Sequence, residues 1–233
     1  MKKKLYFVFA LSLVGLLSSC VKVVNRPEVR KEEEKNVKVR QFNRIKVSAF
    51  CDVHYEQGDS LSVRIVGSQK SMSRLRTICD GTTLTIEQTK RAKCTDLGRY
   101  GDVDVYVTSP DLVEVSMNGA GDFKVKSHLD TDTFNVRMEG AGDIEIEDLI
   151  CDQIHVTLKG AGDVELKNVI ASYSDIRLKG VGDVKVNFKR CDRVTCELEG
   201  VGDIKVAGQV GRIRHDVKGT GTIDLDDLHV LEK

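Results

Sequence analysis

Aspartate follows a pair of glycines at five regularly spaced points of this sequence, in the motif Gly-x-Gly-Asp. Carboxylates at such turns either accept hydrogen bonds from backbone N–H groups of the turn or ligate calcium, which prefers oxygen ligands. The motifs lie 20 or 21 residues apart, unlike calcium-binding repeats of about nine residues. We therefore expect hydrogen bonding, with a weak calcium ladder as the alternative, and predict no metal or cofactor. The aspartates are Asp122, Asp143, Asp163, Asp183 and Asp203.

A second candidate for chemistry is the pair Cys196 and His215, each four residues before the first glycine of its motif. Stacked repeats would bring the two side chains together, and a cysteine beside a histidine can act as nucleophile and base. The alternation of apolar and polar residues places both on the core side, where a cysteine acts as a small hydrophobe. The sequence also has no GxSxG, HExxH or P-loop motif. We therefore expect no enzymatic activity.

The N-terminus resembles the signal peptide of a bacterial lipoprotein. A lysine run at 2–4 precedes an apolar run over 5–17, which is shorter than the roughly 20 residues that cross a membrane. Leu17-Ser18-Ser19-Cys20 is similar to a lipobox, in which the peptidase cuts before a cysteine that carries lipid. We predict a signal peptide over 1–19 and acyl chains on Cys20 that hold the protein at a membrane. An ordinary secretory signal is the alternative.

The charge and the cysteines limit the remaining functions. The chain has 36 basic and 36 acidic residues, and loss of 1–19 would leave a net charge of about −3. This balance gives no electrostatic basis for binding nucleic acid. Export permits disulfides, whose pairing the sequence leaves open, and the lack of CxxC counts against zinc. The cysteines after Cys20 are Cys51, Cys79, Cys94, Cys151, Cys191 and Cys196.

A repeat built around the glycine motif fills the second half of the chain. Apolar residues alternate with polar ones on both sides of each motif, as in Val115 and Met117 before it and Phe123 and Val125 after it. This pattern predicts two short strands per repeat, bent at the glycines, and stacked repeats would form continuous apolar columns. The predicted fold class is all-β, a single-stranded right-handed parallel β-helix with coils of about 20 residues. An antiparallel meander is the alternative. The turn glycines are Gly119, Gly121, Gly140, Gly142, Gly160, Gly162, Gly180, Gly182, Gly200 and Gly202.

The sequence predicts three parts along the chain. Residues 1–19 are the lipoprotein signal peptide. Residues 20–40 contain the lipidated cysteine and a charged, flexible tether with few apolar residues. Residues 41–233 form the β-helix domain, with irregular coils over 41–110 and the glycine repeats over 111–233.

Residues 41–230 resemble the bacterial family described as "Putative auto-transporter adhesin, head GIN domain". The resemblance implies a single-stranded right-handed β-helix on exported proteins, often lipoproteins, and implies no particular ligand. The cysteines are not part of its pattern. The motifs that carry it are Phe42-x-x-Ile45-x-Val47, Asp52-Val53-x-Tyr55-x-Gln57-Gly58-Asp59, Asp80-Gly81-x-x-Leu84-x-Ile86, Val103-x-Val105-Tyr106-Val107-x-x-Pro110-x-Leu112 and Gly119-x-Gly121-Asp122.

These observations predict a lipid-anchored protein of the cell envelope that acts as a non-enzymatic binding, adhesion or structural module. The membrane would be reached through the lipid, and the partner would be an envelope or host protein or glycan. No acidic residue follows Cys20 directly, which by resemblance to other lipoproteins favours the outer membrane and leaves periplasmic or surface exposure open. A polysaccharide-processing enzyme is the alternative, although the chain has only 5% aromatic residues and no tryptophan. The edge of the last coil suggests a homo-oligomer.

Overall fold

The computed structural model of this 233-residue protein describes residues 32–89 and 103–231. The predicted signal peptide, Cys20, Cys94 and the first part of the predicted tether lie outside the described residues. In the described part, no helix is long and apolar enough to cross a membrane. The fold is all-β, and its one described helix, α1 (Gln69–Met72), is a single turn.

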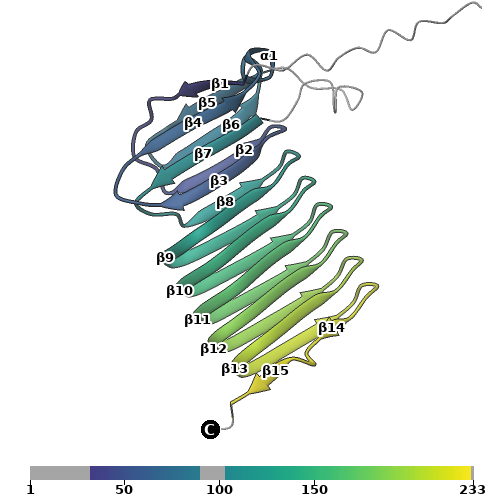
Figure 1. The fold of residues 1–233 in the computed structure, drawn as a ribbon. Coiled ribbons are helices and arrows are strands. Elements are labelled where there is room, and N and C mark those ends of the chain that lie inside the picture. Colours follow the sequence, from purple (N-terminus) through teal and green to yellow (C-terminus); the bar gives the residue numbers. More distant parts are fainter. Residues whose placement is uncertain (1–31, 90–102, 232–233) are drawn as a thin grey trace, which may run out of the picture. The chain divides into compact units, whose positions relative to one another are not determined.

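Long strands that wind around a common core dominate the structure (Figure 1). Each strand runs from the residue after one glycine motif to shortly before the next, and each pairs in parallel with the strand before and after it. The protein is therefore a β-solenoid, and the antiparallel meander is excluded for the repeat. These strands are β9 (Phe123–Met138), β10 (Ile144–Leu158), β11 (Val164–Leu178), β12 (Val184–Leu198) and β13 (Ile204–Val217).

Equivalent residues of successive coils stack directly over one another. Ile144 pairs with Val164, which pairs with Val184, and that residue pairs with Ile204. All four side chains are fully buried. Stacking like on like aligns each apolar face with the next, and a slip of one residue would turn every apolar side chain to solvent. The hydrophobic pattern therefore fixes the register.

The sequence predicts two short strands per repeat, whereas the structure has one continuous strand of 14 to 16 residues. The prediction is wrong because the bends opposite the glycine motif preserve most of the pairing between coils. In β10 the alternation is interrupted at Glu147-Asp148 and again at Asp152-Gln153, where two successive residues lie outside the core. Between these interruptions Leu149 and Cys151 point inward and add two further core columns.

The N-terminal region continues both faces of the solenoid with shorter strands. On one face β6 (Thr83–Gln88), β2 (Arg44–Ser48) and β8 (Glu114–Met117) run parallel next to β9. On the other face β7 (Val103–Ser109) and β3 (Asp52–Gln57) run parallel next to β9. The coil made by β2 and β3 is thus inserted between the coil of β6 and β7 and the coil of β8 and β9, out of sequence order.

Antiparallel strands finish this end of the stack. They are β1 (Glu33–Asn36) and β4 (Ser62–Gly67) beyond β7, and β5 (Leu75–Cys79) beyond β6. The pairing of β1 corrects the predicted tether, because residues 33–36 belong to the sheet and Val37 and Val39 pack against the core. At the other end the chain closes with β14 (Ile223–Asp224) and β15 (Leu228–Val230), which both pair with β13.

Candidate binding surface

The glycine corners bring successive coils too close for any side chain. A Cβ at Gly162 would lie 1.9 Å from the carbonyl oxygen of Gly142, and a Cβ at Gly160 would lie 2.1 Å from that of Gly140. Gly162 also has a φ of 138°, a backbone conformation that residues with a Cβ rarely adopt. The glycines therefore serve the approach of backbone to backbone, and the residue between them points outward.

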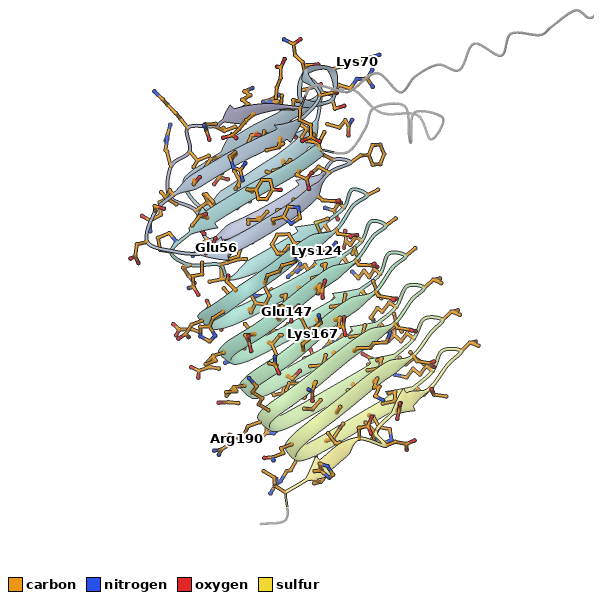
Figure 2. All side chains as sticks on the ribbon, viewed as in Figure 1. Glu56, Lys70, Lys124, Glu147, Lys167 and Arg190 are labelled. Carbon is orange, nitrogen blue, oxygen red and sulfur yellow. The ribbon has the colours of Figure 1, made fainter. Side chains whose placement is uncertain are left out.

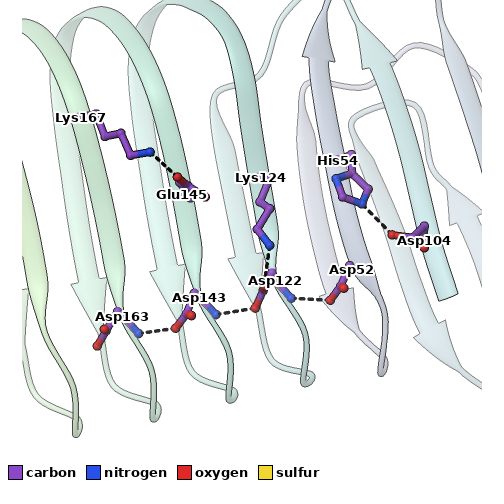
Figure 3. A network of polar contacts seen from close by, with 9 residues as sticks. All are labelled: Asp52, His54, Asp104, Asp122, Lys124, Asp143, Glu145, Asp163 and Lys167. Atoms are coloured by element: carbon purple, nitrogen blue, oxygen red, sulfur yellow. Dashed lines mark hydrogen bonds and ion pairs between the residues drawn. The ribbon is translucent and has the colours of Figure 1, made fainter. Parts of the chain in front are cut away.

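The aspartates of the motif form a continuous hydrogen-bonded ladder (Figure 3). The backbone N–H of Asp143 donates to Asp122 Oδ1 at 3.2 Å, that of Asp163 to Asp143 Oδ1 at 2.9 Å, and that of Asp183 to Asp163 Oδ1 at 2.8 Å. Each carboxylate thus satisfies a donor of the following coil rather than of its own turn. Asp203 ends the ladder by accepting from the backbone N–H and the hydroxyl of Thr222, and these bonds hold the pKa of its carboxyl below the ordinary value.

The ladder begins earlier than the glycine motifs do. Asp52 Oδ1 accepts from the backbone N–H of Asp122 at 2.9 Å, so Ala49-Phe50-Cys51-Asp52 occupies the place of a Gly-x-Gly-Asp corner. Sequence reasoning missed Asp52 because only the aspartate of the motif is retained there. Phe50 bridges to Ala120 in the position of the outward residue, and this match of register is visible only in the structure.

The geometry of the ladder favours hydrogen bonding over calcium. One oxygen of each carboxylate already accepts a backbone N–H, and Asp122 additionally binds Lys124 Nζ at 2.7 Å. Among residues 32–89 and 103–231, no three His, Cys, Asp or Glu side chains gather as a metal site would require. The ladder therefore acts as a seam that joins successive coils.

Four of the described cysteines are buried, and burial disfavours the thiolate form of their side chains. Burial raises the pKa of Cys51, Cys151 and Cys196 to about 12 and that of Cys191 to about 11. A thiol must lose its proton to act as a nucleophile, so these side chains remain neutral packing groups near neutral pH. All the described cysteines, Cys79 among them, are free.

Cys196 and His215 are paired in register, but the surroundings of their side chains differ. The two residues are direct partners of β12 and β13. Cys196 is buried, whereas His215, at the core-facing position of the last full strand, is exposed. The two residues therefore share one side of the strands, as predicted, but only Cys196 is covered. No described strand covers this part of β13, and its core-facing positions are therefore open.

An aromatic and charged cluster on the outer face was not predicted from the sequence. Tyr106 of β7 lies between Arg64 of β4 and His54 of β3, with the guanidinium carbon 4.1 Å from its ring centroid and the imidazole stacked on it at 4.8 Å. His54 Nε2 is 2.7 Å from Asp104 Oδ1, an interaction drawn in Figure 3. The cluster depends on strand pairs up to about fifty residues apart, which a linear pattern does not reveal.

This cluster borders a shallow depression of about 520 Å³. Its lining combines aromatic rings, an imidazole, two ammonium groups, a carboxylate and hydroxyls, which suit a polar ligand with hydrogen-bonding groups. Tyr106 is 36% exposed, so its edge remains available. Its polar and aromatic lining residues include His54, Glu56, Tyr106, Thr108, Lys124 and Lys126.

Charged side chains cover the outer faces along the whole stack, as Glu56, Lys124, Glu147 and Lys167 illustrate in Figure 2. Opposite charges on neighbouring coils meet, for example where Lys167 Nζ lies against Glu145 and 2.9 Å from Glu147 Oε1. These carboxylates raise the pKa of Lys167. Such exposed pairs contribute little to stability, and they keep the sheet surface soluble.

The fold and this surface define the described part of the chain as a β-solenoid with a polar outer face. The family described as "Putative auto-transporter adhesin, head GIN domain" matches residues 41–168 and 167–232. The chain belongs to this family, as the sequence motifs predict.

Solved structures of bacterial proteins share the fold. A protein from Bacteroides fragilis NCTC 9343, described as a putative adhesin, is 24% identical with a TM-score of 0.70, and the alignment covers 84% of this chain and 97% of that one. A protein from Parabacteroides distasonis ATCC 8503, described as a putative lipid binding protein, is 17% identical with a TM-score of 0.60, covering 86% and 97%. A putative adhesin from Parabacteroides merdae ATCC 43184 is 20% identical with a TM-score of 0.53, covering 83% and 95%. No curated protein matches the chain.

Proposed function

We propose that this chain is an exported, lipid-anchored and non-enzymatic binding module of the cell envelope. Cys20 carries the lipid in this proposal, residues 1–19 are the signal peptide, and the outer membrane holds the anchor. The solenoid, which we expect to be right-handed, presents its outer face to an envelope or host protein or glycan. The observation that carries the proposal is membership of an adhesin-type family together with an exposed depression on the outer face that is lined by aromatic and charged side chains.

The depression at Tyr106 is the part of the surface best suited to a glycan. Arg64 and His54 hold the ring from the two neighbouring strands, so little conformational entropy would be lost on binding. Lys126 offers this depression an ammonium group for an acidic sugar, while Lys124 is already bound to Asp122.

The absence of catalysis in the proposal rests on the chemistry of the available groups. The described buried thiols have raised pKa values, and the aspartates of the corner are engaged by backbone N–H groups. A screen of acidic and neutral polysaccharides for new reducing ends or unsaturated products tests this point. If the purified protein turns over any of these polysaccharides, the proposal of a binding module is wrong and the chain is a polysaccharide-processing enzyme.

Binding is tested by exposing the purified full chain to an array of acidic and neutral oligosaccharides and to immobilised fibronectin, laminin and collagen. Tyr106→Ala should lower the affinity for the probe that is bound by at least tenfold. The matched control is Tyr173→Ala, which removes a tyrosine in edge contact with His155 at 5.9 Å on the repeat and should leave binding unchanged. Equal loss in both variants, or no binding by the unaltered chain, would contradict the proposed surface.

The anchor is tested separately by fractionating cells that express the chain or its Cys20→Ala variant. The unaltered chain should sediment with the outer membrane and incorporate labelled fatty acid. Cys20→Ala should lose the label, because its side chain has no thiol to acylate. Incorporation of label by the variant would refute lipidation at this residue.

A further inference from the structure

The last full strand of the solenoid leaves part of one edge without a partner. β13 pairs along its length with β12, but β14 covers only Ile204 and Lys205, and β15 covers only residues 208–210. Among residues 32–89 and 103–231, no strand pairs with residues 211–217 on the side away from β12. A β-strand edge of this kind offers unpaired N–H and C=O groups to another strand.

Core positions are open along the same stretch. Ile213 lies in the column of Phe134, Ile154 and Val194, all of which are fully buried, and is itself only partly covered. Val217 ends the column of Leu198 and is 44% exposed. His215 lies between them in sequence and is exposed as well. The edge therefore exposes an apolar strip. In each earlier coil the equivalent strip is buried by the next coil.

We propose that a second copy of this chain pairs with residues 212–218 as an antiparallel strand, with a two-fold axis at His215. This register places Ile213 opposite Val217 on the core side. It places Arg214 opposite Asp216 on the solvent side. Both pairs occur twice by symmetry, so the interface has two apolar contacts and two pairs of opposite charge, as an isologous contact requires.

Neighbouring registers are much less complementary. An axis at Arg214 brings the two Arg214 side chains together and sets Ile213 against His215. An axis at Asp216 opposes the two aspartates and sets Arg214 against Lys218. Registers shifted by a single residue set core-side positions against solvent-side ones. The charges along this edge thus select one arrangement, in which only Arg212 and Lys218 at the margin carry like charge.

Arg214 and Asp216 are placed so that they can form ion pairs with a second copy. Asp216 Oδ2 lies 2.8 Å from Lys218 Nζ on its own strand, while Arg214 has no ion pair with any described residue. Val230 and Leu231, which follow on the neighbouring part of the end, are 53% and 45% exposed. A second copy would cover these apolar side chains as it covers Ile213 and Val217.

Site-directed cross-linking of the full chain in intact cells tests the register. His215→Cys is introduced with Cys79→Ser, Cys94→Ser and Cys196→Val, because Cys196 is the register partner of residue 215 within one chain and would compete for the disulfide. The cells are treated with copper–phenanthroline. Opposed residues of an antiparallel pair have Cβ atoms about 4.5–5.5 Å apart, so most of the chain should form a disulfide-linked dimer. The matched control is Ser172→Cys, an exposed residue at a bend of β11, which should stay monomeric. Equal cross-linking at both positions, or none at residue 215, overturns the proposal.

Charge reversal tests the pairing itself. Asp216→Arg and Arg214→Asp each replace two attractive pairs by two repulsive ones and should lower cross-linking through His215→Cys by about tenfold. The double variant Arg214→Asp with Asp216→Arg restores opposite charges and should recover the dimer. Both positions are exposed, and unchanged melting of each variant excludes misfolding. A double variant that stays as weak as the single ones refutes the proposed register. Failure of these tests would leave the proposed ligand binding and lipidation untouched, because those are measured with other variants.

Discussion

The N-terminal region and the glycine repeat extend the same two sheets by different means. Between β9 and β13 every coil is joined to the next in parallel, and the register shifts only around the first bend of the strands. Beyond β6 and β7 the chain adds β1, β4 and β5 in antiparallel orientation instead. The repeat thus propagates from coil to coil, whereas the N-terminal region ends the stack. The outermost strand, β1, has all four residues exposed and carries Glu33, Glu34 and Lys35, charges that protect an edge from further pairing.

The corners show what the repeat demands and the N-terminal region does not. Ala49 and Cys51 occupy the two places that Gly119 and Gly121 occupy in the next coil, and their carbonyl oxygens are the atoms that a Cβ on those glycines would strike, at 1.9 and 2.2 Å. A coil therefore needs glycine because of the coil it stacks upon. The motif therefore encodes the distance between coils as well as the turn.

The largest expected effect comes from Gly162→Ala in the middle of the repeat. The added Cβ meets a backbone oxygen that has no room to move, and the φ of 138° is unfavourable for alanine. We expect a loss of at least about 4 kcal/mol of unfolding free energy, or no folded protein, measured by urea denaturation. Gly81→Ala is the control from the N-terminal region. Gly81 has a φ of 96° and nothing within 4 Å of the added atom, so its cost should stay at about 1–2 kcal/mol. If Gly162→Ala and Gly81→Ala cost the same unfolding free energy, the close approach of stacked coils is not the reason for glycine at position 162.

The second prediction compares one core column at its middle and at its end. Ile154→Ala empties a fully buried position and should cost about 2–5 kcal/mol. Ile213→Ala alters the same column in the last coil, where the side chain is only partly covered, and should cost about 1 kcal/mol in dilute monomeric protein. Denaturation at several protein concentrations separates the two settings. A cost at Ile213 that grows with concentration would show that a second copy buries it.

The third prediction concerns the ladder that crosses both regions. Asp163→Ala removes the acceptor for the N–H of Asp183 at 2.8 Å, and hydrogen bonds to charged groups contribute about 1.5–3 kcal/mol. Asp163→Asn keeps a neutral acceptor and should lose less. Asp52→Ala should cost as much as Asp163→Ala, because its carboxylate plays the same part for Asp122. A negligible effect at Asp52 would confine the ladder to the glycine repeat.

The smallest effect is a difference in sensitivity to alkali. Burial raises the pKa of Cys51 and Cys196 from 9 to about 12, so the folded state keeps a proton that the unfolded state releases above pH 9. Stability from each thiol is thus complete below pH 9 and is lost as the pH rises toward 12. Cys196→Val should reduce the loss between pH 9 and pH 10 by about 1 kcal/mol, measured by urea denaturation with a reductant. Cys51→Val should do the same in the N-terminal region, and an unchanged slope in either variant would argue against a buried neutral thiol there.

The sequence was sufficient for the features that repeat and insufficient for those that do not. The alternation around Phe123 and Ile144 predicts the core columns, and the glycine spacing predicts the corners, since both arise from local geometry applied at every coil. The bend at Glu147-Asp148 was missed because polar residues without glycine mark it. The cluster of His54 and Tyr106 was missed because it depends on which distant strands become neighbours, and that order is set by packing of the whole N-terminal region.

Each glycine corner contacts the corner of the preceding coil in the same way. The cross-section of the solenoid is therefore the same at every coil, whatever the number of coils. Excising residues 160–179, which run from one motif to the next, would join Lys159 to Gly180 and leave every remaining contact type intact. The molecule can therefore change its reach in steps of one strand spacing, about 4.8 Å, without redesign of its interior. The length of the solenoid and the chemistry of its surface are then separate heritable traits, the first set by duplication of coils and the second by substitutions on the outside.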